Sequence, residues 1–199
     1  MLCELLVEEL QDLLHAEGQL LKALPKMAKA AHAPRLKAAF EAHRKESEDH
    51  VERLKQAFEL LDAKVKTKPC KAMLGLVEEG NETIVEGKEK EENIADLALI
   101  SAAQRVEHYE ISAYGSAKAM AEQLGNSKVT KLLSQTQVEE ENADKLLTEL
   151  AKPISRARRR GRNQRKAVVY QRAICLPFVI DCVTSLKSAM CSSVGTCGS

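Results

Sequence analysis

Apolar residues recur at steps of three, four and seven over most of the chain, which is the spacing of one face of an α-helix. Pro34 suits the first turn of a helix, and Gly125 followed by Asn126 is typical of one helix ending and the next beginning. Pro25 lies inside an apolar-periodic segment and predicts a kink there. The pattern predicts a shorter helix over residues 70–86 and long helices over residues 4–31, 34–62, 93–124 and 127–151.

Four long helices in two hairpin pairs, joined by a longer crossover, match an all-α, antiparallel four-helix bundle of ferritin-like connectivity with the short helix in the crossover. We expect this bundle to be one domain of residues 1–152, with Leu124 and Leu146 on its apolar faces. Composition agrees, because only 3% of the residues are aromatic whereas Leu, Ala, Glu and Lys recur throughout. All-β folds are excluded, since strands need many β-branched and aromatic residues.

Charge divides the chain into an acidic body and a basic tail. The net charge is +1, but residues 153–199 carry nine Lys and Arg residues and one acid, Asp181. An acidic body gives no reason to expect nucleic acid on the main domain, whereas the tail has the charge to attract nucleic acid or anionic lipid. The tail contains Ser, Gly and Cys and has no helical periodicity, so we expect residues 153–199 to be disordered.

Cysteine usage and apolar runs indicate a reduced, cytoplasmic protein. The six cysteines are irregularly spaced and form no Cys-x-x-Cys pair, which argues against a zinc site or a disulfide framework. Acidic residues near the start do not fit a secretory signal. The longest apolar run of the tail, residues 174–180, is too short to span a membrane.

Carboxylates and imidazoles interrupt the apolar face of every long helix near its middle. In the first helix, Glu17 follows Leu10 and Leu13 and precedes Leu20 at the same helical spacing. An unpaired buried carboxylate is costly, and several converging carboxylates also repel one another. No Lys or Arg lies on the central faces, so we expect metal ions to compensate these charges.

The residue types favour iron or manganese, which bind oxygen ligands together with imidazole. Di-iron bundles place one Glu on each of two helices and a Glu-x-x-His pair on each of the other two. Here the corresponding pairs are Glu46 with His50 and Glu140 with Asp144, so Asp stands in place of the second His. Both pairs are spaced i,i+4 rather than i,i+3, which still keeps each pair on one face of its helix. The sequence therefore predicts a two-metal site with the candidate ligands Glu17, Glu46, His50, Glu107, Glu110, Glu140 and Asp144.

Single positions also have structural alternatives. Glu46 could lie on a solvated face, and either acid of the third long helix could form an ion pair at the rim. His43 could orient Glu46 from outside the ligand set. Glu139 is predicted to be an exposed neighbour of the inward Glu140. The coincidence of acids on four helices favours a metal site over these alternatives.

Six segments of the chain follow one another in a specific order: ELQDLLHAE (residues 9–17), LPKMAKAA (24–31), HVERL (50–54), CKAMLG (70–75), RVEHYEISAYG (105–115) and EEENADKL (139–146). In this order they resemble the YciF-like bacterial stress proteins. The resemblance covers residues 4–152 and implies a closed four-helix domain with a shorter helix in the crossover, homodimers and induction under stress. The pair Glu107 and Glu110 also resembles the rubrerythrin arrangement, in which the third helix offers two Glu ligands one turn apart.

A di-metal centre of this kind favours redox chemistry, namely oxidation of Fe(II) by O₂ or peroxide with carboxylates bridging the metals. The sequence holds no rubredoxin-like Cys₄ module as electron donor, which argues against a complete rubrerythrin-type peroxidase. Two alternatives stay open. One is a non-catalytic, dimeric helical stress protein without functional metal, and the other is attachment to nucleic acid or a membrane through the basic tail.

Overall fold

The computed structural model describes residues 1–152, and all regular secondary structure within them is helical. The helices are α1 (Leu2–Ala30), α2 (Pro34–Leu60), α3 (Lys71–Gly87), α4 (Glu92–Gln123) and a further helix over residues 127–152, here called the fifth helix. Each lies within two residues of a predicted segment, so the predicted all-α fold is confirmed. The basic tail, which we predicted to be disordered, lies outside the described residues.

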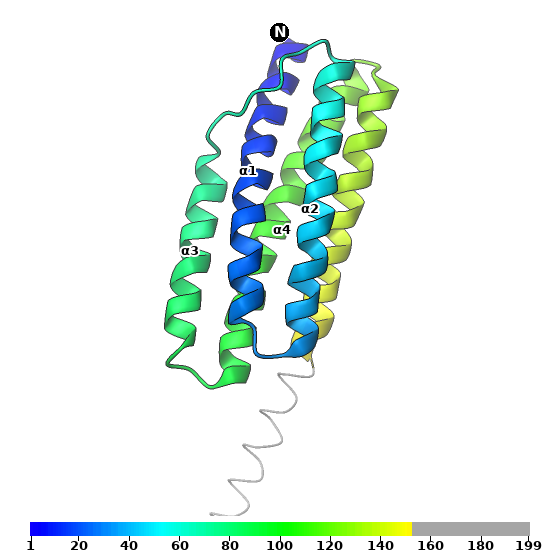
Figure 1. Cartoon of the computed structure of the whole chain (residues 1–199). Coiled ribbons are helices and arrows are strands. Elements are labelled where there is room, and N and C mark those ends of the chain that lie inside the picture. The colour runs from blue at the N-terminus through cyan, green and yellow to red at the C-terminus, as the bar shows by residue number, and fades with distance from the viewer. Residues whose placement is uncertain (153–199) are drawn as a thin grey trace, which may run out of the picture. The chain divides into compact units, whose positions relative to one another are not determined.

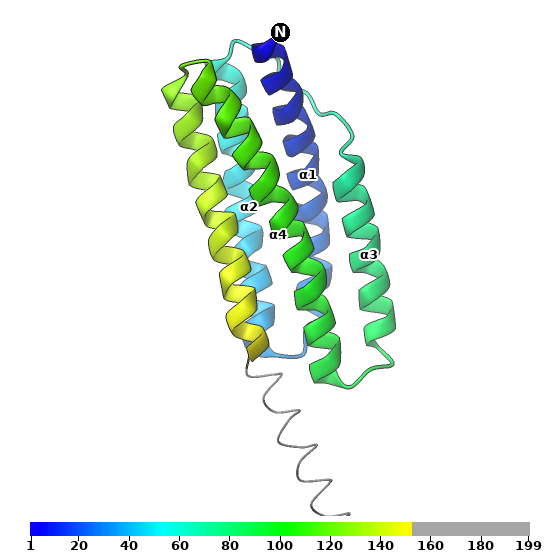
Figure 2. The ribbon, with the colours of Figure 1, turned by 180° about the vertical axis from the view of Figure 1, so that it is seen from behind.

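The long helices stand side by side as two hairpins (Figure 1). One hairpin is α1 with α2, and the other is α4 with the fifth helix. The crossover between them consists of residues 61–70 and α3, which packs against α1 and α4 on the outside of the bundle (Figures 1 and 2). None of the helices in residues 1–152 combines the length and the apolar character that crossing a membrane requires.

Local sequence explains where the helices begin and end. Pro34 occupies the first turn of α2, where its missing amide hydrogen has no helical partner to lose. Gly125 adopts a φ of +68°, a left-handed conformation that glycine reaches without steric strain. Asn126 then accepts a hydrogen bond from the backbone N–H of Val129 at 3.2 Å and caps the fifth helix. Pro25 does not interrupt α1, which continues through it to Ala30.

Polar contacts hold α3 against α1 and α4. The Cys70 thiol accepts a hydrogen bond from the N–H of Met73 at 3.3 Å and so caps α3, while the Cys70 N–H donates to His15 Nδ1 at 3.1 Å. The Tyr109 hydroxyl lies 2.9 Å from the Cys70 sulfur and donates to Asp12 Oδ2 at 2.6 Å. Three helices therefore meet at the start of α3.

The apolar core is divided into two clusters along the bundle. One cluster, near the start of α1, includes Leu6, Leu10, Leu54, Phe58 and Val129. The other, near the end of α1, includes Leu24, Phe40, Met73, Ile100 and Leu147. The stretch between the two clusters is filled by the polar side chains that interrupt the apolar faces, so the fold places these side chains in the middle of the bundle.

The prediction that Leu124 and Leu146 face the core is wrong. Their exposed fractions are 37% and 44%. Leu124 follows the last helical residue of α4, where helical periodicity no longer sets its direction. Leu146 lies beside Leu147, which occupies the inward position, and successive residues are rotated by about 100° around a helix.

Asp96 is a buried acid whose role is structural. Its side chain is 2% exposed and accepts hydrogen bonds from the backbone N–H groups of His32 and Ala33, each at 2.8 Å. Both amides belong to the loop between α1 and α2, so Asp96 ties α4 to that loop. A carboxylate that accepts two amide hydrogens needs no further partner.

We expect Asp96→Ala to lower the free energy of unfolding by about 2–4 kcal/mol, because two backbone N–H groups lose their acceptor. Denaturant unfolding followed by circular dichroism measures the change. Asp49→Ala, which removes an exposed acid of α2, is the matched control and should change stability by less than about 0.5 kcal/mol. Equal unfolding midpoints for the two variants would contradict the structural role of Asp96.

Candidate metal centre

The middle of the bundle contains a layer of buried polar side chains, which we call the polar centre. No member is more than 6% exposed. Each of the four long helices contributes through the same face that carries its apolar residues, so packing of the two apolar clusters brings the polar side chains together. The members are Glu17 of α1, His43, Ser47 and His50 of α2, Glu107, Glu110 and Tyr114 of α4, and Thr136 and Glu140 of the fifth helix.

Two groups of possible ligand atoms lie within the polar centre. In the His43 group, one ligand atom from each of His43, Glu107, Glu110 and Glu140 lies within 4.8 Å of the others. In the His50 group, one ligand atom from each of Glu17, His50 and Glu140 likewise lies within 4.8 Å of the others. Glu140 belongs to both groups, so a cation held by one group would share a carboxylate with a cation held by the other.

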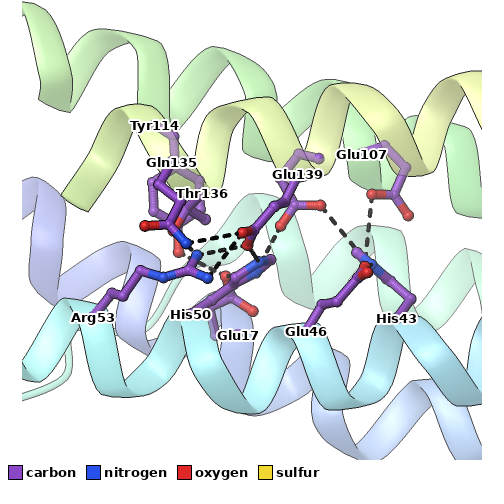
Figure 3. Close-up of polar contacts among 11 residues, drawn as sticks. Glu17, His43, Glu46, His50, Arg53, Glu107, Tyr114, Gln135, Thr136 and Glu139 are labelled. Atoms are coloured by element: carbon purple, nitrogen blue, oxygen red, sulfur yellow. Dashed lines mark hydrogen bonds and ion pairs between the residues drawn. The ribbon is translucent and has the colours of Figure 1, made fainter. Parts of the chain in front are cut away.

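His43 lies between the inner acids and the surface. Its Nε2 atom is 3.4 Å from Glu107 Oε2 and 3.5 Å from Glu140 Oε2. Its Nδ1 atom is 3.3 Å from Oε2 of Glu46, a residue outside the polar centre (Figure 3). One ring therefore contacts a buried pair of acids on one side and an exposed acid on the other.

His50 is surrounded by carboxylates. Its Nδ1 atom lies 2.9 Å from Glu140 Oε1 and 3.2 Å from Glu17 Oε1, and its Nε2 atom lies 3.0 Å from Glu139 Oε2. The Tyr114 hydroxyl donates a 2.6 Å hydrogen bond to Glu17 Oε1 (Figure 3). These contacts orient the ring and one oxygen of Glu17, and they leave the second oxygen of Glu17 without a hydrogen bond among the described residues.

Several buried oxygens lack a hydrogen-bond partner within the described part of the chain. Both oxygens of Glu110 are in this position, although the side chain is fully buried. Glu107 Oε2 and both oxygens of Glu140 also make no well-formed hydrogen bond, even where an imidazole lies within ion-pair distance. Buried polar atoms are rarely left without a partner, so this arrangement has unused capacity to bind a cation.

The imidazoles take up protons in response to the surrounding acids. Burial lowers the pKa of His50, but the close contacts with the carboxylates of Glu140 and Glu17 outweigh burial and raise the pKa from 6.5 to about 10. Burial likewise lowers the pKa of His43, whereas the carboxylate of Glu107 and other acids raise it to about 9. Without a bound cation, both rings are therefore protonated at neutral pH.

The acids of the polar centre respond to burial in two ways. Burial raises the pKa of Glu107 and of Glu110 well above the usual value of 4.5, and neighbouring carboxylates raise the pKa of Glu110 further. Burial also acts to raise the pKa of Glu140, but the nearby imidazoles of His50 and His43 together outweigh burial and lower this pKa. Protons on imidazoles and on buried carboxyl groups thus compensate the acids when no metal ion does.

The structure brings five of the seven predicted ligands into the polar centre, namely Glu17, His50, Glu107, Glu110 and Glu140. The burial of both α4 acids excludes the alternative in which they form ion pairs at the rim. Arg105, which precedes them on α4, pairs instead with Glu79 of α3 at 2.8 Å.

Glu46 and Asp144 lie outside both ligand groups. The side chain of Glu46 is 51% exposed, which matches the solvated alternative. Asp144 is 22% exposed, accepts a 2.8 Å hydrogen bond from Gln104 and lies 3.4 Å from His108. A spacing of four residues turns a helix about 40° past a full rotation, which is enough to move Asp144 from the interior towards α4.

Two residues of the site are placed differently from the sequence-based expectations. His43 shares the inward face of α2 with His50, as its spacing of seven residues indicates, but it belongs to the ligand groups themselves rather than only orienting Glu46 from outside. The prediction that Glu139 is exposed is wrong, since its side chain is 26% exposed and receives hydrogen bonds from Arg53 at 2.6 and 3.0 Å. We expected no Lys or Arg on the central faces beside the acids, and Arg53 of α2 is the exception. Its long side chain reaches Glu139 of the fifth helix, next to the polar centre (Figure 3).

A pocket of about 150 Å³ adjoins the polar centre between α2 and the fifth helix. Its lining includes the buried residues His43 and Glu107 together with the exposed Glu46. Ala39, Ala42 and Ala143 also line it, and their short side chains leave the space open. The pocket therefore connects the ligand groups with the surface of the bundle.

The donor set fits hard, divalent metal ions. The ligand groups offer carboxylate oxygens and imidazole nitrogens, a combination that suits iron and manganese, and contain no thiolate. The four carboxylates could neutralise the charge of two divalent cations. The unpaired oxygens of Glu110 supply the structural observation that favours this use over a purely internal hydrogen-bond network.

Known proteins share this fold and much of this sequence. YciF of Escherichia coli K12 is 46% identical over 149 residues, which cover 74% of this chain and 89% of that protein. The crystal structure of the E. coli stress protein YciF superposes with a TM-score of 0.75 at 43% identity and covers 78% of this chain and 98% of that chain. A Rhodopseudomonas palustris protein, YcfI, described as a putative structural protein, has a TM-score of 0.71 at 36% identity over 74% of this chain and 93% of its own.

A Xanthomonas campestris protein of known structure has a TM-score of 0.63 at 23% identity, covering 79% of this chain and 95% of its own, and shows the fold alone. The sequence pattern of a family described as a domain of unknown function, DUF892, matches residues 1–160. This match extends over most of the chain and agrees with the similarity to YciF. The chain therefore belongs to the DUF892 family and is a YciF-like stress protein.

Proposed function

We propose that the polar centre binds two divalent metal ions, iron or manganese, and that the loaded centre reacts with O₂ or peroxide. The proposal rests chiefly on Glu110, whose two buried oxygens have no hydrogen-bond partner among the described residues. Glu110 is also close to Glu107 and Glu140, so it adds a like charge where charge is already dense. A bound cation would give the Glu110 oxygens a partner and would compensate the repulsion between the carboxylates.

The two ligand groups define which residues would hold each ion. His43, Glu107 and Glu110 would bind one ion, Glu17 and His50 would bind the other, and Glu140 would be shared. Tyr114 would act on the second ion indirectly, because its hydroxyl orients one oxygen of Glu17 and leaves the other free. Glu139 would likewise orient the ring of His50 through its contact with Nε2, and Arg53 would hold Glu139 in place for this contact.

The chemistry supplied by such a pair of ions, when iron, is transfer of two electrons. Reduction of one hydrogen peroxide to two waters takes two electrons and two protons, so one pair of ferrous ions matches one peroxide. An external reductant would have to return the electrons for a second turnover. The chain's own residues would hold the ions, and the apolar clusters on either side would limit the access of water to them.

A second candidate function is a non-catalytic structural role in stress. It is favoured by the position of His43 and His50, which compensate the inner acids as protonated imidazoles without any metal. The description of the R. palustris relative as a putative structural protein is consistent with it. Homodimer formation and a role for the tail stay predictions under either function.

Metal content separates the two candidates. Chain purified without chelator and loaded anaerobically with Fe(II) or Mn(II) should hold about two ions. Glu110→Gln should hold about one, because the His43 group loses a charged ligand while the His50 group stays intact. Elemental analysis after desalting gives the numbers.

Asp144→Asn is the matched control and should keep about two ions, because Asp144 lies outside both ligand groups. The metal-free form of Glu110→Gln should be at least as stable as the wild type, which shows that any loss of metal is not a folding defect. Wild-type chain that retains less than about 0.2 ions would support the structural role instead.

The pKa shifts predict how the stability of the metal-free chain depends on pH. The folded pKa values of about 10 for His50 and about 9 for His43 lie above the unfolded value of 6.5. The folded chain therefore binds more protons, and the stabilisation present below pH 6.5 is lost as pH rises towards these values. The raised pKa values of Glu107 and Glu110 act in the same direction.

We expect Tm of the metal-free chain to fall by on the order of 10 °C between pH 6.5 and 8.5. Bound metal displaces these protons, so the difference in Tm between the metal-loaded and metal-free forms should widen over the same interval. Thermal unfolding with excess EDTA or excess Mn(II) measures both trends. A metal-free Tm that rises with pH would contradict the protonation of His43 and His50.

A further inference from the structure

The pocket between α2 and the fifth helix spans the distance between solvent and the polar centre. On the solvent side lies Glu46, whose side chain is 51% exposed, and on the inner side lie His43 and Glu107, which are buried. His43 Nε2 and Glu107 Oε2 are both buried without a hydrogen-bond partner among the described residues. The pocket therefore ends on buried polar atoms that lack a hydrogen-bond partner among the described residues.

Three carboxylates line this pocket, and Glu107 lies buried at its inner end. Of the other two, Glu46 and Glu139, only Glu46 is available to a cation from solvent. Glu139 is held by the two nitrogens of Arg53 at 2.6 and 3.0 Å, by His50 Nε2 at 3.0 Å and by Gln135 at 3.2 Å. Glu46 makes a single polar contact within the described residues, with His43 Nδ1 at 3.3 Å. The charge of Glu46 is thus the less compensated of the two.

Charge distinguishes this pocket from a larger groove between α1 and α2. The groove, about 710 Å³ in volume, is lined by four basic residues and two acids. Its acids, Glu41 and Glu48, are paired with Lys37 and Arg44. The basic excess repels cations, and neither ligand group contributes to the lining of the groove.

We propose that divalent metal ions reach the polar centre through the pocket between α2 and the fifth helix, and that Glu46 is the residue that first binds them. His43 then separates this outer position from Glu107 and Glu140, since its two ring nitrogens face Glu46 on one side and the inner acids on the other (Figure 3). The inference rests on the proposed metal-binding function and adds to it a route and an outer site. Glu46 controls the rate of loading rather than the final content.

The rate of metal uptake tests this role. Metal-free full-length chain is mixed with Co(II) in a stopped-flow instrument, and the visible absorbance of the bound ion is followed. Glu46→Gln should slow loading about tenfold at low ionic strength, because removal of one charge weakens electrostatic steering into the pocket. The final cobalt content and the equilibrium affinity should stay within about twofold of the wild type, since Glu46 belongs to neither ligand group.

Two further variants complete the design. Glu41→Gln removes an exposed acid of α2 that lines the basic groove, and it should load at the wild-type rate. Ala143→Leu narrows the pocket without changing charge, and it should slow loading while leaving the final cobalt content unchanged. High salt should reduce the difference between the wild type and Glu46→Gln, but not the effect of Ala143→Leu.

The possible outcomes are distinguishable. Wild-type loading rates in both Glu46→Gln and Ala143→Leu overturn the route and leave the metal-binding function intact. A loss of one ion from Glu46→Gln at equilibrium makes Glu46 a resident ligand and overturns its role in loading. Failure of the wild-type chain to bind Co(II) at all overturns the metal-binding function, and the route falls with it.

Discussion

Repulsion among four carboxylates inside an apolar bundle is the constraint on which this structure depends. Glu17, Glu107, Glu110 and Glu140 come from three helices and meet where a core of leucines would otherwise continue. Two apolar clusters, one on each side, hold the helices at packing distance and so force the acids together. Positive charge has to enter the centre, either as protons on the imidazoles and buried carboxyl groups or as metal ions.

This constraint links metal binding, protonation and stability to one another. The protons that His43 and His50 carry without metal are the same protons that a metal ion must displace, so conditions that favour one state disfavour the other. Exchange between the two states requires a path for ions. The pocket beside His43 fits such a path, because it lies where the bundle is lined by alanines.

Burial of an acid does not by itself indicate a function, as Asp96 and Glu110 show. Both are almost completely removed from solvent. Asp96 accepts two backbone N–H groups and ties a loop to α4, whereas neither oxygen of Glu110 has a hydrogen-bond partner among the described residues. The difference lies in the partners rather than in the residue type, and the similarity to YciF, which extends over the whole bundle, does not distinguish the two acids.

The amino-acid sequence by itself determined the helices, the crossover and the inward direction of Glu17, His50 and Glu140, because helical periodicity sets the side of a helix from which a residue projects. Only the tertiary structure decided that His43 joins a ligand group while Glu46 and Asp144 stay outside both groups. A residue about 40° from the middle of a face meets either the interior or a neighbouring helix, depending on how the helices pack. That packing depends on contacts between segments far apart in the chain, which the periodicity of one helix does not contain.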